Sequence, residues 1–261
     1  MFFVKYISLR VKLRNMKLLV CISKTPDTTS KIRFDAEGKK FVEDGVQFII
    51  NPYDEWYSLV KAIEIKEKLG GQVDVIHVGN ANSDILIRKA LAIGADAAFR
   101  IDDEALNSTS VASQIAAFIK ENPYDLIFVG KETIDHNSSE VGSKLAAFLD
   151  IPFVSYCNHL DVENDIAVCS TEIEGGNEII ELKTPFVLSS AKGLAEQRIP
   201  NMKGIIDAKK KPLNVLQRMN VENHIDLVRF ETPPVKSGVR MIDPSNIEEM
   251  VNVYKNELKI I

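Results

Sequence analysis

The sequence predicts an α/β fold: a doubly wound, mainly parallel sheet with helices on both faces, plus a marginal hairpin and a C-terminal arm. Short apolar runs alternate with longer segments of helical periodicity from residue 18 to residue 157, the pattern of successive β-α units. The apolar runs are hydrophobic on both faces, as buried parallel strands are. Glycines follow several of the helical segments, where they favour a helix C-terminus.

The first strand is expected at residues 18–22, and turn sequences inside residues 31–50 predict a hairpin after it. Asn51-Pro52 opens a helix that runs to about Leu69 and stops at Gly70-Gly71. Further strands are expected at 73–78, 97–101, 125–129 and 152–157, and further helices at 84–93, 110–120 and 139–149.

The pattern changes after residue 157. Alternating stretches between 159 and 181, separated by Glu174-Gly175-Gly176-Asn177, predict an antiparallel hairpin at the sheet margin. Beyond residue 211 the chain carries Pro212, Pro233, Pro234 and Pro244 among polar residues and is poor core material. We therefore expect an α/β domain over residues 16–211 and an arm over 212–261, with a terminal helix at about 244–258.

Composition limits the function. The chain has 261 residues, 45% of them hydrophobic, and a net charge of −5, which supports one substantial core and gives no reason to expect nucleic acid binding. No run approaches the roughly 20 apolar residues that cross a membrane, so we expect no membrane insertion. Cys21, Cys157 and Cys169 are odd in number and lack CxxC spacing, which favours a reducing compartment.

Residues 1–15 are expected to lie outside the fold. The segment is basic, with Lys5, Arg10, Lys12 and Arg14 and no acidic residue, and so superficially suits a mitochondrial transit segment. It has few hydroxyl residues, which favours an upstream start codon or a dispensable extension. Cytoplasmic residence is the resulting expectation, with the mitochondrial matrix as the alternative.

Three loops follow strand ends where open α/β sheets bind ligands. They are residues 23–27, 51–54 and 130–142. In the third, Gly130 permits a sharp exit from the strand, and the helix start that follows offers backbone donors to a phosphate. The loop lacks both the GxGxxG and the GxxxxGK[ST] patterns. Two interpretations remain open on this evidence: a nucleotide site and a plain polar loop.

Residues 191–211 form a charged segment after the apolar run 185–188, and such a segment is better suited to meeting a partner than to building a core. It resembles the β-subunits of the electron-transfer flavoproteins, which have Leu-Asn-Glu-Pro-Arg and an Ala-Lys-Lys-Lys run here. Ala195 and Gln197 depart from that pattern, and the resemblance extends from about Met16 to the C-terminus. The matching residues are Leu194, Glu196, Arg198, Ala208, Lys209, Lys210 and Lys211.

The resemblance implies a nucleotide-binding fold of the adenine type, with structural AMP at the third loop. Gly130, Lys131, Ile134 and Asp135 match the family's Gly-Lys-Gln-Ala-Ile-Asp-Asp-Asp loop, and residues 136–139 depart from it. The residues that the resemblance assigns to cofactor binding are Cys21, Asn51, Pro52, Tyr53, Asp54, Val78, Gly130, Lys131, Thr133, Ile134, Asp135, His136, Asn137, Ser138 and Ser139.

The resemblance also implies FAD, held mainly by an α-subunit. Tyr53 falls where the family has an aromatic ring near the flavin, or else it packs the helix start; Thr28 falls where some members have tyrosine. Electrons would come from acyl-CoA or other flavin dehydrogenases and pass through a quinone oxidoreductase towards the respiratory chain. Leu194, with Glu196 and Arg198, would be the anchor for a dehydrogenase, and residues 209–211 would steer the partner or form a solvated tether.

No catalytic or metal-binding constellation is evident. His136 lies in a loop without an obvious acid partner, and His77 lies within an expected strand; His159 and His224 fall in the hairpin and the arm. We therefore expect an electron carrier without catalytic residues of its own. Two alternatives remain: a flavin-bifurcating relative with a second FAD at the AMP site, and a stand-alone adenine-nucleotide-binding stress-type protein, whose glycine pattern Gly130 and Gly142-Ser143 match only in part.

Overall fold

The computed structural model describes residues 15–52, 54–104, 107–219, 221, 225–236 and 238–261. They fall into two compact units. The larger contains the chain up to Lys31 together with Glu43–Val228, and the smaller contains Ile32–Val42 and Arg229–Ile261. Of the extension expected at residues 1–15, only Asn15 is among the described residues.

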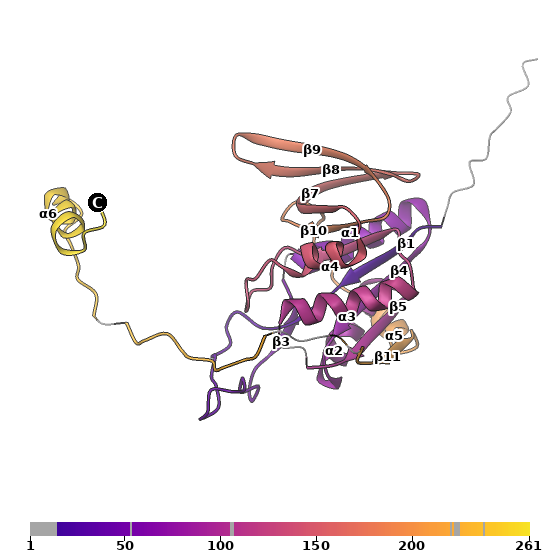
Figure 1. Ribbon diagram of the computed structural model, residues 1–261, viewed down its shortest axis with the longest axis horizontal. Helices are drawn as coiled ribbons and strands as arrows, with labels where there is room; N and C mark the ends of the chain where they lie inside the picture. Colours follow the sequence, from indigo (N-terminus) through magenta and orange to yellow (C-terminus); the bar gives the residue numbers. More distant parts are fainter. Residues whose placement is uncertain (1–14, 53, 105–106, 220, 222–224, 237) are drawn as a thin grey trace, which may run out of the picture. The chain divides into compact units, whose positions relative to one another are not determined.

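The larger unit is built on one long sheet (Figure 1). Within the described residues its strand order is β11-β5-β4-β1-β6-β10-β7-β8-β9. The strands from β11 to β7 are parallel to their neighbours, and β8 and β9 add antiparallel pairs at one margin. The bounds are β1 Lys17–Cys21, β4 Gln72–Val78, β5 Ala97–Asp102, β6 Leu126–Gly130, β7 Phe153–Glu163, β8 Ile166–Ile173, β9 Gly176–Lys183, β10 Phe186–Ser190 and β11 Leu213–Gln217.

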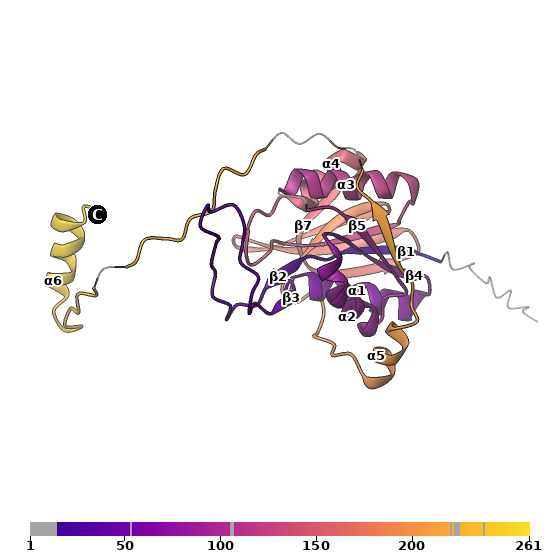
Figure 2. The same ribbon diagram turned by 90° about the horizontal axis from the view of Figure 1, so that it is seen from below.

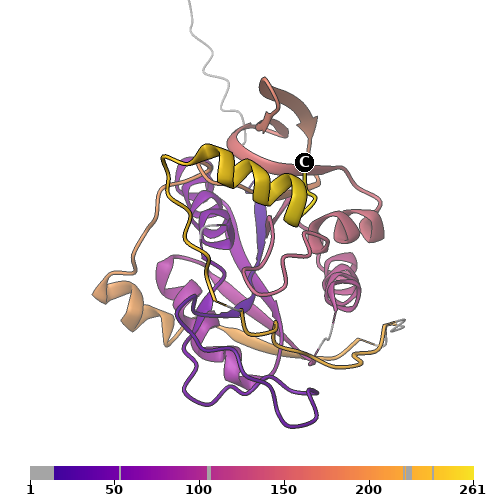
Figure 3. The ribbon, with the colours of Figure 1, turned by 90° about the vertical axis from the view of Figure 1, so that its left-hand side faces the viewer.

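Helices cover both faces of this sheet (Figures 2 and 3). Helices α1 (Asp54–Leu69) and α2 (Asp84–Ile93) lie on one face, α2 preceded by the short 3₁₀ turn η1 (Ala81–Ser83), and α3 (Ser108–Glu121) and α4 (Val141–Leu149) lie on the other. Helix α5 (Met202–Ala208) packs against α2. A separate two-stranded pair joins β2 (Lys24–Pro26) to β3 (Phe48–Ile50). The doubly wound α/β fold expected from the sequence is confirmed.

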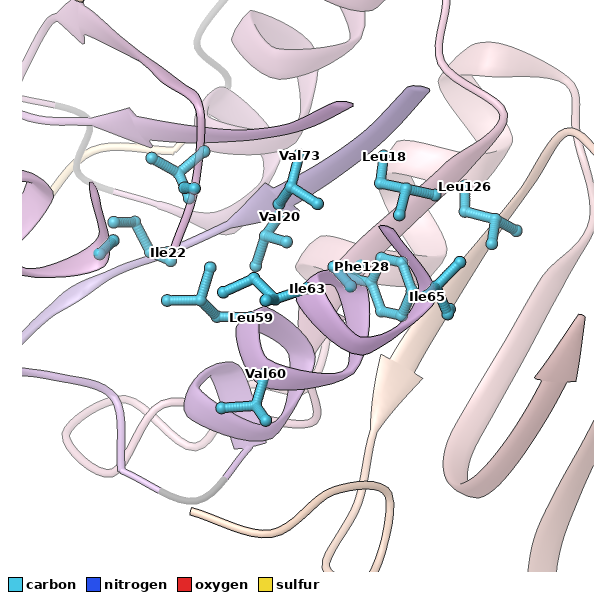
Figure 4. Close-up of a cluster of buried hydrophobic side chains, with 14 of the residues drawn as sticks. Leu18, Val20, Ile22, Leu59, Val60, Ile63, Ile65, Val73, Leu126 and Phe128 are labelled. Carbon is cyan, nitrogen blue, oxygen red and sulfur yellow. The ribbon is translucent and has the colours of Figure 1, made fainter. Parts of the chain in front are cut away.

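Strand β1 shows why both faces are covered. Its alternate side chains Leu18 and Val20 pack in one core cluster with Leu59 and Ile63 of α1 (Figure 4), whereas Leu19 and Cys21 pack in a second cluster with helices α3 and α4. Side chains of a strand alternate between faces, so a strand that is apolar throughout needs helices on both sides. No helix in the described part of the chain is long and apolar enough to cross a membrane.

Two elements differ from the expected bounds because of local backbone conformation and pairing. Helix α4 begins at Val141, two residues later than expected, because Asn137 and Ser139 have positive φ values of 49° and 53°, which a right-handed helix does not contain. Strand β7 runs past Cys157 to Glu163 because its second half pairs antiparallel with β8.

The boundary of the arm at residue 212 is wrong. Residues Leu213–Gln217 form β11, an edge strand of the main sheet that pairs in parallel with β5. Leu213 packs against one core cluster and Leu216 against the other, so the apolar residues of this short strand are used on both faces. The proline content concealed the strand, although proline is compatible with the first position of a strand.

The smaller unit has its own contacts. Within it, Phe34 pairs with Phe41 in an isolated bridge and stacks on Phe230 with ring centroids 4.8 Å apart. Helix α6 spans Ile247–Asn252 and continues as one π-helical turn, η2, over Val253–Glu257. The terminal helix therefore starts three residues after Pro244, where the side chain of Asn246 accepts a hydrogen bond from the backbone N–H of Glu249 at 3.2 Å.

Candidate functional site

A cavity opens where β1, β4 and β6 end, beside the first turns of α1 and α4. Its floor is apolar and comes from these three strands and α3, and its rim is polar and comes from the loops after β1 and β6. This is the edge at which parallel sheets bind ligands. The lining residues are Cys21, Ile22, Ser23, Glu55, His77, Val78, Val111, Ile115, Val129, Gly130, Lys131, Glu132, Thr133, Ser138, Ser139, Glu140 and Val141.

The loop after β6 is fastened to the start of α1. The Asn51 side chain is fully buried; its Nδ2 donates to the carbonyl oxygen of Glu132 at 2.8 Å, and its Oδ1 accepts from the backbone N–H of Ile134 at 3.0 Å. Asp54 Oδ2 accepts from the backbone N–H of Glu132 at 3.3 Å. An amide that satisfies both a donor and an acceptor of the same loop fixes the loop's position.

Glu55 fastens the loop after β1 to the same helix start. Its two carboxyl oxygens lie 2.6 Å from the backbone nitrogen and 2.6 Å from the hydroxyl of Ser23. The side chain is buried, and burial raises the pKa of the Glu55 carboxyl to about 8, a rise that the Ser23 hydrogen bonds oppose and the negative charges of Asp54 and Asp135 reinforce. We call Asn51, Asp54 and Glu55 the α1 clamp, because together they hold both walls of the cavity.

Gly130 is required by the α1 clamp. A Cβ atom at this position would lie 2.8 Å from Cγ of Glu55 and 3.4 Å from both Nδ2 of Asn51 and Cβ of Asp54. The first distance is shorter than carbon atoms tolerate without a shift of the neighbour. The glycine at the end of β6 therefore lets α1 approach the strand closely enough to bind both loops.

The carboxylates on the polar rim have partners. Glu132 lies 3.1 Å from Nζ of Lys131 and accepts from the Ser139 hydroxyl at 3.0 Å, and these hydrogen bonds lower its pKa. Glu140, at the start of α4, accepts from Nζ of Lys144. Because each carboxylate is paired with an ammonium group, the rim carries less negative charge than its sequence indicates.

The three histidines that the structure describes do not form a catalytic group. Nδ1 of His77 lies 2.8 Å from the carbonyl oxygen of Ile22, to which it donates, and burial lowers the pKa of this imidazole. His77 is thus neutral and helps to hold the end of β1 against β4. His136 is exposed and sits 3.9 Å from Asp135, and His159 lies on β7 beside Asp161. Within the described residues no group of His, Cys, Asp and Glu side chains is arranged to hold a metal ion.

The expected cofactor residues fall into three sets. Cys21, Val78, Gly130, Lys131, Thr133, Ser138 and Ser139 line the cavity. Tyr53 lies outside the described residues. The others do not line the cavity, although Asn51 and Asp54 position its walls; this set is Asn51, Pro52, Asp54, Ile134, Asp135, His136 and Asn137.

Sequence reasoning missed part of the cavity. Glu55 directly follows the 51–54 segment, and both of its carboxyl oxygens accept hydrogen bonds from Ser23 in the loop after β1. The available signal was its position at a helix start, beside Asp54. Val111 and Ile115 of α3 gave no such signal, because their apolar spacing resembles that of any core-facing helix.

Comparison with known proteins shows which family the chain belongs to. A family model described as the electron transfer flavoprotein domain matches residues 39–219, which is more than half of the chain. The chain belongs to the electron transfer flavoprotein family.

Curated members of this family match nearly the whole chain. An electron transfer flavoprotein subunit beta of Thermoanaerobacterium thermosaccharolyticum is 35% identical over 248 residues and covers 94% of each chain. The subunit beta of Bacillus subtilis is 33% identical and covers 94% of this chain and 100% of its own. A subunit of a caffeyl-CoA reductase-Etf complex of Acetobacterium woodii is 29% identical over 94% of this chain and 98% of its own. The resemblance to the β-subunits and an electron-transfer role are thereby confirmed.

The structure corrects the expected exposure of Leu194. In this electron transfer flavoprotein domain Leu194 is 3% exposed and belongs to the larger core cluster. Gly193 adopts a φ of 104°, and the backbone N–H of Leu194 then donates to the carbonyl of Ala191 at 3.3 Å. This turn directs the leucine inwards, where burial of its side chain stabilises the fold by about 2 kcal/mol.

Other residues of the 191–211 segment are also committed to internal contacts. Arg198 forms a bidentate ion pair with Glu67 of α1 at 2.8 and 3.0 Å. Nζ of Lys211 donates to the carbonyl oxygens of Leu91 and Ala95 at 2.9 and 2.6 Å, and so satisfies acceptors at the end of α2. Lys211 is therefore not available for steering, whereas Glu196, Lys209 and Lys210 are exposed.

Proposed function

We propose that this chain is the β-subunit of a heterodimer that accepts electrons from flavin dehydrogenases and passes them towards the respiratory chain, with AMP bound in the cavity as a structural nucleotide. The observation that carries the proposal is the position of the cavity. It lies at the carboxyl ends of β1, β4 and β6, in a domain of the electron transfer flavoprotein family, and its walls are fixed by the α1 clamp.

The residues of the cavity fit an adenine nucleotide. Val78, Val111, Ile115 and Val129 offer an apolar floor of the kind that receives a flat heteroaromatic ring. At the other end Ser138 and Ser139 place hydroxyl groups beside the N-terminus of α4, which favours an anion. Lys131 also lines the cavity, where its ammonium group pairs with Glu132. This chain's part is to bind, orient and shield the nucleotide.

FAD, held mainly by the α-subunit in this proposal, supplies the one-electron chemistry when it is bound. The described residues contain no catalytic group that would act on a substrate. Asn51 and Asp54 hold a wall of the cavity, and the proposal places this part of the chain nearest to the flavin. The chain is then a positioning subunit and an electron carrier, not an enzyme.

The smaller unit supports an obligate partner of the α-subunit type. Many of its large apolar side chains are exposed, and a monomeric protein rarely exposes so many in one segment. Covering them takes a permanent partner, since obligate interfaces are the more apolar class. The exposed residues are Val235, Val239, Met241, Ile247, Met250, Val251, Tyr254, Leu258, Ile260 and Ile261.

The electron donors in this proposal are acyl-CoA or other flavin dehydrogenases, and a quinone oxidoreductase is the acceptor. We also propose that the protein resides in the cytoplasm. The proposed function involves no membrane insertion and no nucleic acid, and the net charge of −5 is in keeping with the absence of nucleic acid binding.

A flavin-bifurcating relative with a second FAD in the cavity is the second candidate. One relative of comparable coverage is a subunit of a caffeyl-CoA reductase-Etf complex, and the loop after β6 departs from the family's usual residues at 136–139. Membership of the electron transfer flavoprotein family argues against the third reading, a stand-alone stress-type protein.

A reconstitution experiment tests the carrier function. The chain is co-expressed with an electron transfer flavoprotein α-subunit, purified, and mixed with an acyl-CoA dehydrogenase and its substrate. We expect a stable heterodimer whose flavin absorbance bleaches only when the dehydrogenase and substrate are both present. A heterodimer whose flavin stays oxidised with every flavin dehydrogenase tried would contradict the proposal.

A further inference from the structure

The carboxylate of Glu132 engages two hydrogen-bond donors of the cavity rim. Its Oε1 lies 3.1 Å from Nζ of Lys131, and its Oε2 accepts from the hydroxyl of Ser139 at 3.0 Å. All three residues belong to the loop after β6 and line the cavity. Ammonium and hydroxyl groups are also the donors that bind phosphate oxygens. The carboxylate and a phosphate therefore call on the same two donors.

The rest of the rim offers no second cation. Among the described residues that line the cavity, Lys131 is the only lysine or arginine. His77 is neutral because burial lowers the pKa of its imidazole. Glu140 has its own ammonium partner, and burial raises the pKa of the Glu55 carboxyl to about 8. Lys131 is thus the charge for which the Glu132 carboxylate and a phosphate compete.

The backbone of Glu132 is fixed independently of its side chain. Its carbonyl oxygen accepts from Nδ2 of Asn51 at 2.8 Å, and its N–H donates to Oδ2 of Asp54 at 3.3 Å. The side chains of Lys131 and Glu132 are 40% and 32% exposed, and an ion pair with this much contact with water is weak and can exchange partners. The carboxylate can therefore turn away from Lys131 while the loop stays in place, and a substitution of Glu132 tests the side chain alone.

The charge of the ligand decides how strongly Glu132 competes. A phosphate monoester carries a charge of about −1.5 to −2 at pH 7, the same sign as the carboxylate. When Lys131 turns to a phosphate, Glu132 loses its ammonium partner and faces a like charge at short range. Adenosine has no phosphate and leaves the Lys131–Glu132 pair intact, whereas ATP carries more negative charge than AMP.

We propose that Glu132 is a specificity-determining residue of the cavity. Its carboxylate competes with the nucleotide phosphate for Lys131 and Ser139, and so lowers the affinity of the cavity for adenine nucleotides more strongly the more phosphate groups they carry. The carboxylate thereby favours a monophosphate over a triphosphate. This inference rests on the proposed function, in which the cavity binds an adenine nucleotide, and adds the residue that discriminates between such nucleotides.

The test measures binding to the reconstituted heterodimer. Bound nucleotide is removed from the cavity by exhaustive dialysis, and AMP, ATP and adenosine are titrated into the wild type and into Glu132→Gln. Glutamine keeps the size of the side chain and an acceptor for Ser139 but removes the charge. We expect the Kd for AMP to fall about tenfold or more in the variant and the Kd for ATP to fall further. The Kd for adenosine and the thermal midpoint should stay unchanged.

A double-mutant cycle tests the competition itself. Lys131→Gln should weaken AMP binding more in the Glu132→Gln background than in the wild type. The reason is that only in the wild type does the lysine give up a carboxylate partner when it turns to the phosphate. An equal loss in the two backgrounds would show that Lys131 and Glu132 act independently.

Glu64→Gln is the matched control for net charge. Glu64 lies on α1 outside the lining of the cavity, pairs with Lys61 at 3.8 Å and has a side chain that is 40% exposed, so its substitution should leave all three affinities unchanged. The inference is overturned if Glu132→Gln binds AMP no more tightly than the wild type, gains equally for adenosine, fails to form the heterodimer, or gives an additive cycle. A wild-type heterodimer that binds neither AMP nor adenosine would instead refute the nucleotide site of the proposed function, and the inference with it.

Discussion

Replacing Glu55 by glutamine should remove a large part of the pH dependence of the unfolding free energy between about pH 5 and about pH 8. The folded chain keeps a proton on Glu55 up to about pH 8, whereas the ordinary value for a glutamate is 4.5. Between these values the folded state binds more protons than the unfolded state. The stability that Glu55 contributes is therefore present in full below its unfolded pKa of 4.5, and it is lost as the pH rises towards its folded pKa of about 8.

The expected size follows from the shift. Each unit of pKa difference is worth about 1.4 kcal/mol, so the wild type should lose a few kcal/mol across the window through this group alone. Asp54 and Asp74 also have raised pKa values because of burial and contribute in the same direction. Glutamine reproduces the protonated acid, since its oxygen accepts from Ser23 N–H and its amide donates to the Ser23 hydroxyl.

The measurement is urea unfolding of the wild type and Glu55→Gln at several pH values. The difference in unfolding free energy between the two proteins should grow in favour of the glutamine variant as the pH rises, and level off above about pH 8. A difference that stays constant from pH 5 to pH 9 would show that Glu55 is ionised in the folded protein, and that the burial argument is wrong.

Gly130→Ala should disrupt the cavity and destabilise the fold by about 1–3 kcal/mol, the usual cost of an added group in a well-packed site. The new Cβ would meet Cγ of Glu55 at 2.8 Å, so the start of α1 must move away from β6. That movement lengthens the hydrogen bonds of Asn51 and Glu55 to the two loops. We expect the variant to lose most of its bound nucleotide at a protein concentration where the wild type is saturated.

Gly176→Ala is the matched control, because its Cβ has no heavy atom within 4 Å and its backbone is not in the left-handed region. It should change the unfolding free energy by no more than a few tenths of a kcal/mol. Its nucleotide content should equal that of the wild type. Nucleotide retention in Gly130→Ala equal to that of the control would mean that the α1 clamp does not shape the ligand site.

The sheet and the helices could be predicted because their signals are local. A run such as Leu18–Ile22, apolar at every position, and a helix such as α1 with apolar residues three or four apart need no knowledge of distant residues. The edge strand β11 was missed because five residues between prolines and polar side chains carry no such signal, and only pairing with β5 makes them a strand.

The residues of the candidate site could likewise be predicted only where their signals are local. Gly130, Ser138 and Ser139 were found because a loop after a strand is a recognisable pattern. Glu55 was missed because its importance comes from Ser23, 32 residues earlier in the chain. Leu194 was misjudged because the charge of its neighbours predicted exposure, whereas the turn at Gly193 directs this one side chain into the core. Tertiary contacts override composition at these positions.

The most direct test of the account is the nucleotide content of the purified heterodimer. The complex is denatured, and the released nucleotides are separated and quantified against protein. We expect one AMP and one FAD for each heterodimer, with AMP lost selectively in Gly130→Ala. Two FAD would assign the cavity to a second flavin instead of AMP, and a heterodimer that releases no adenine nucleotide beyond a single FAD would contradict the assignment of the cavity as a nucleotide site.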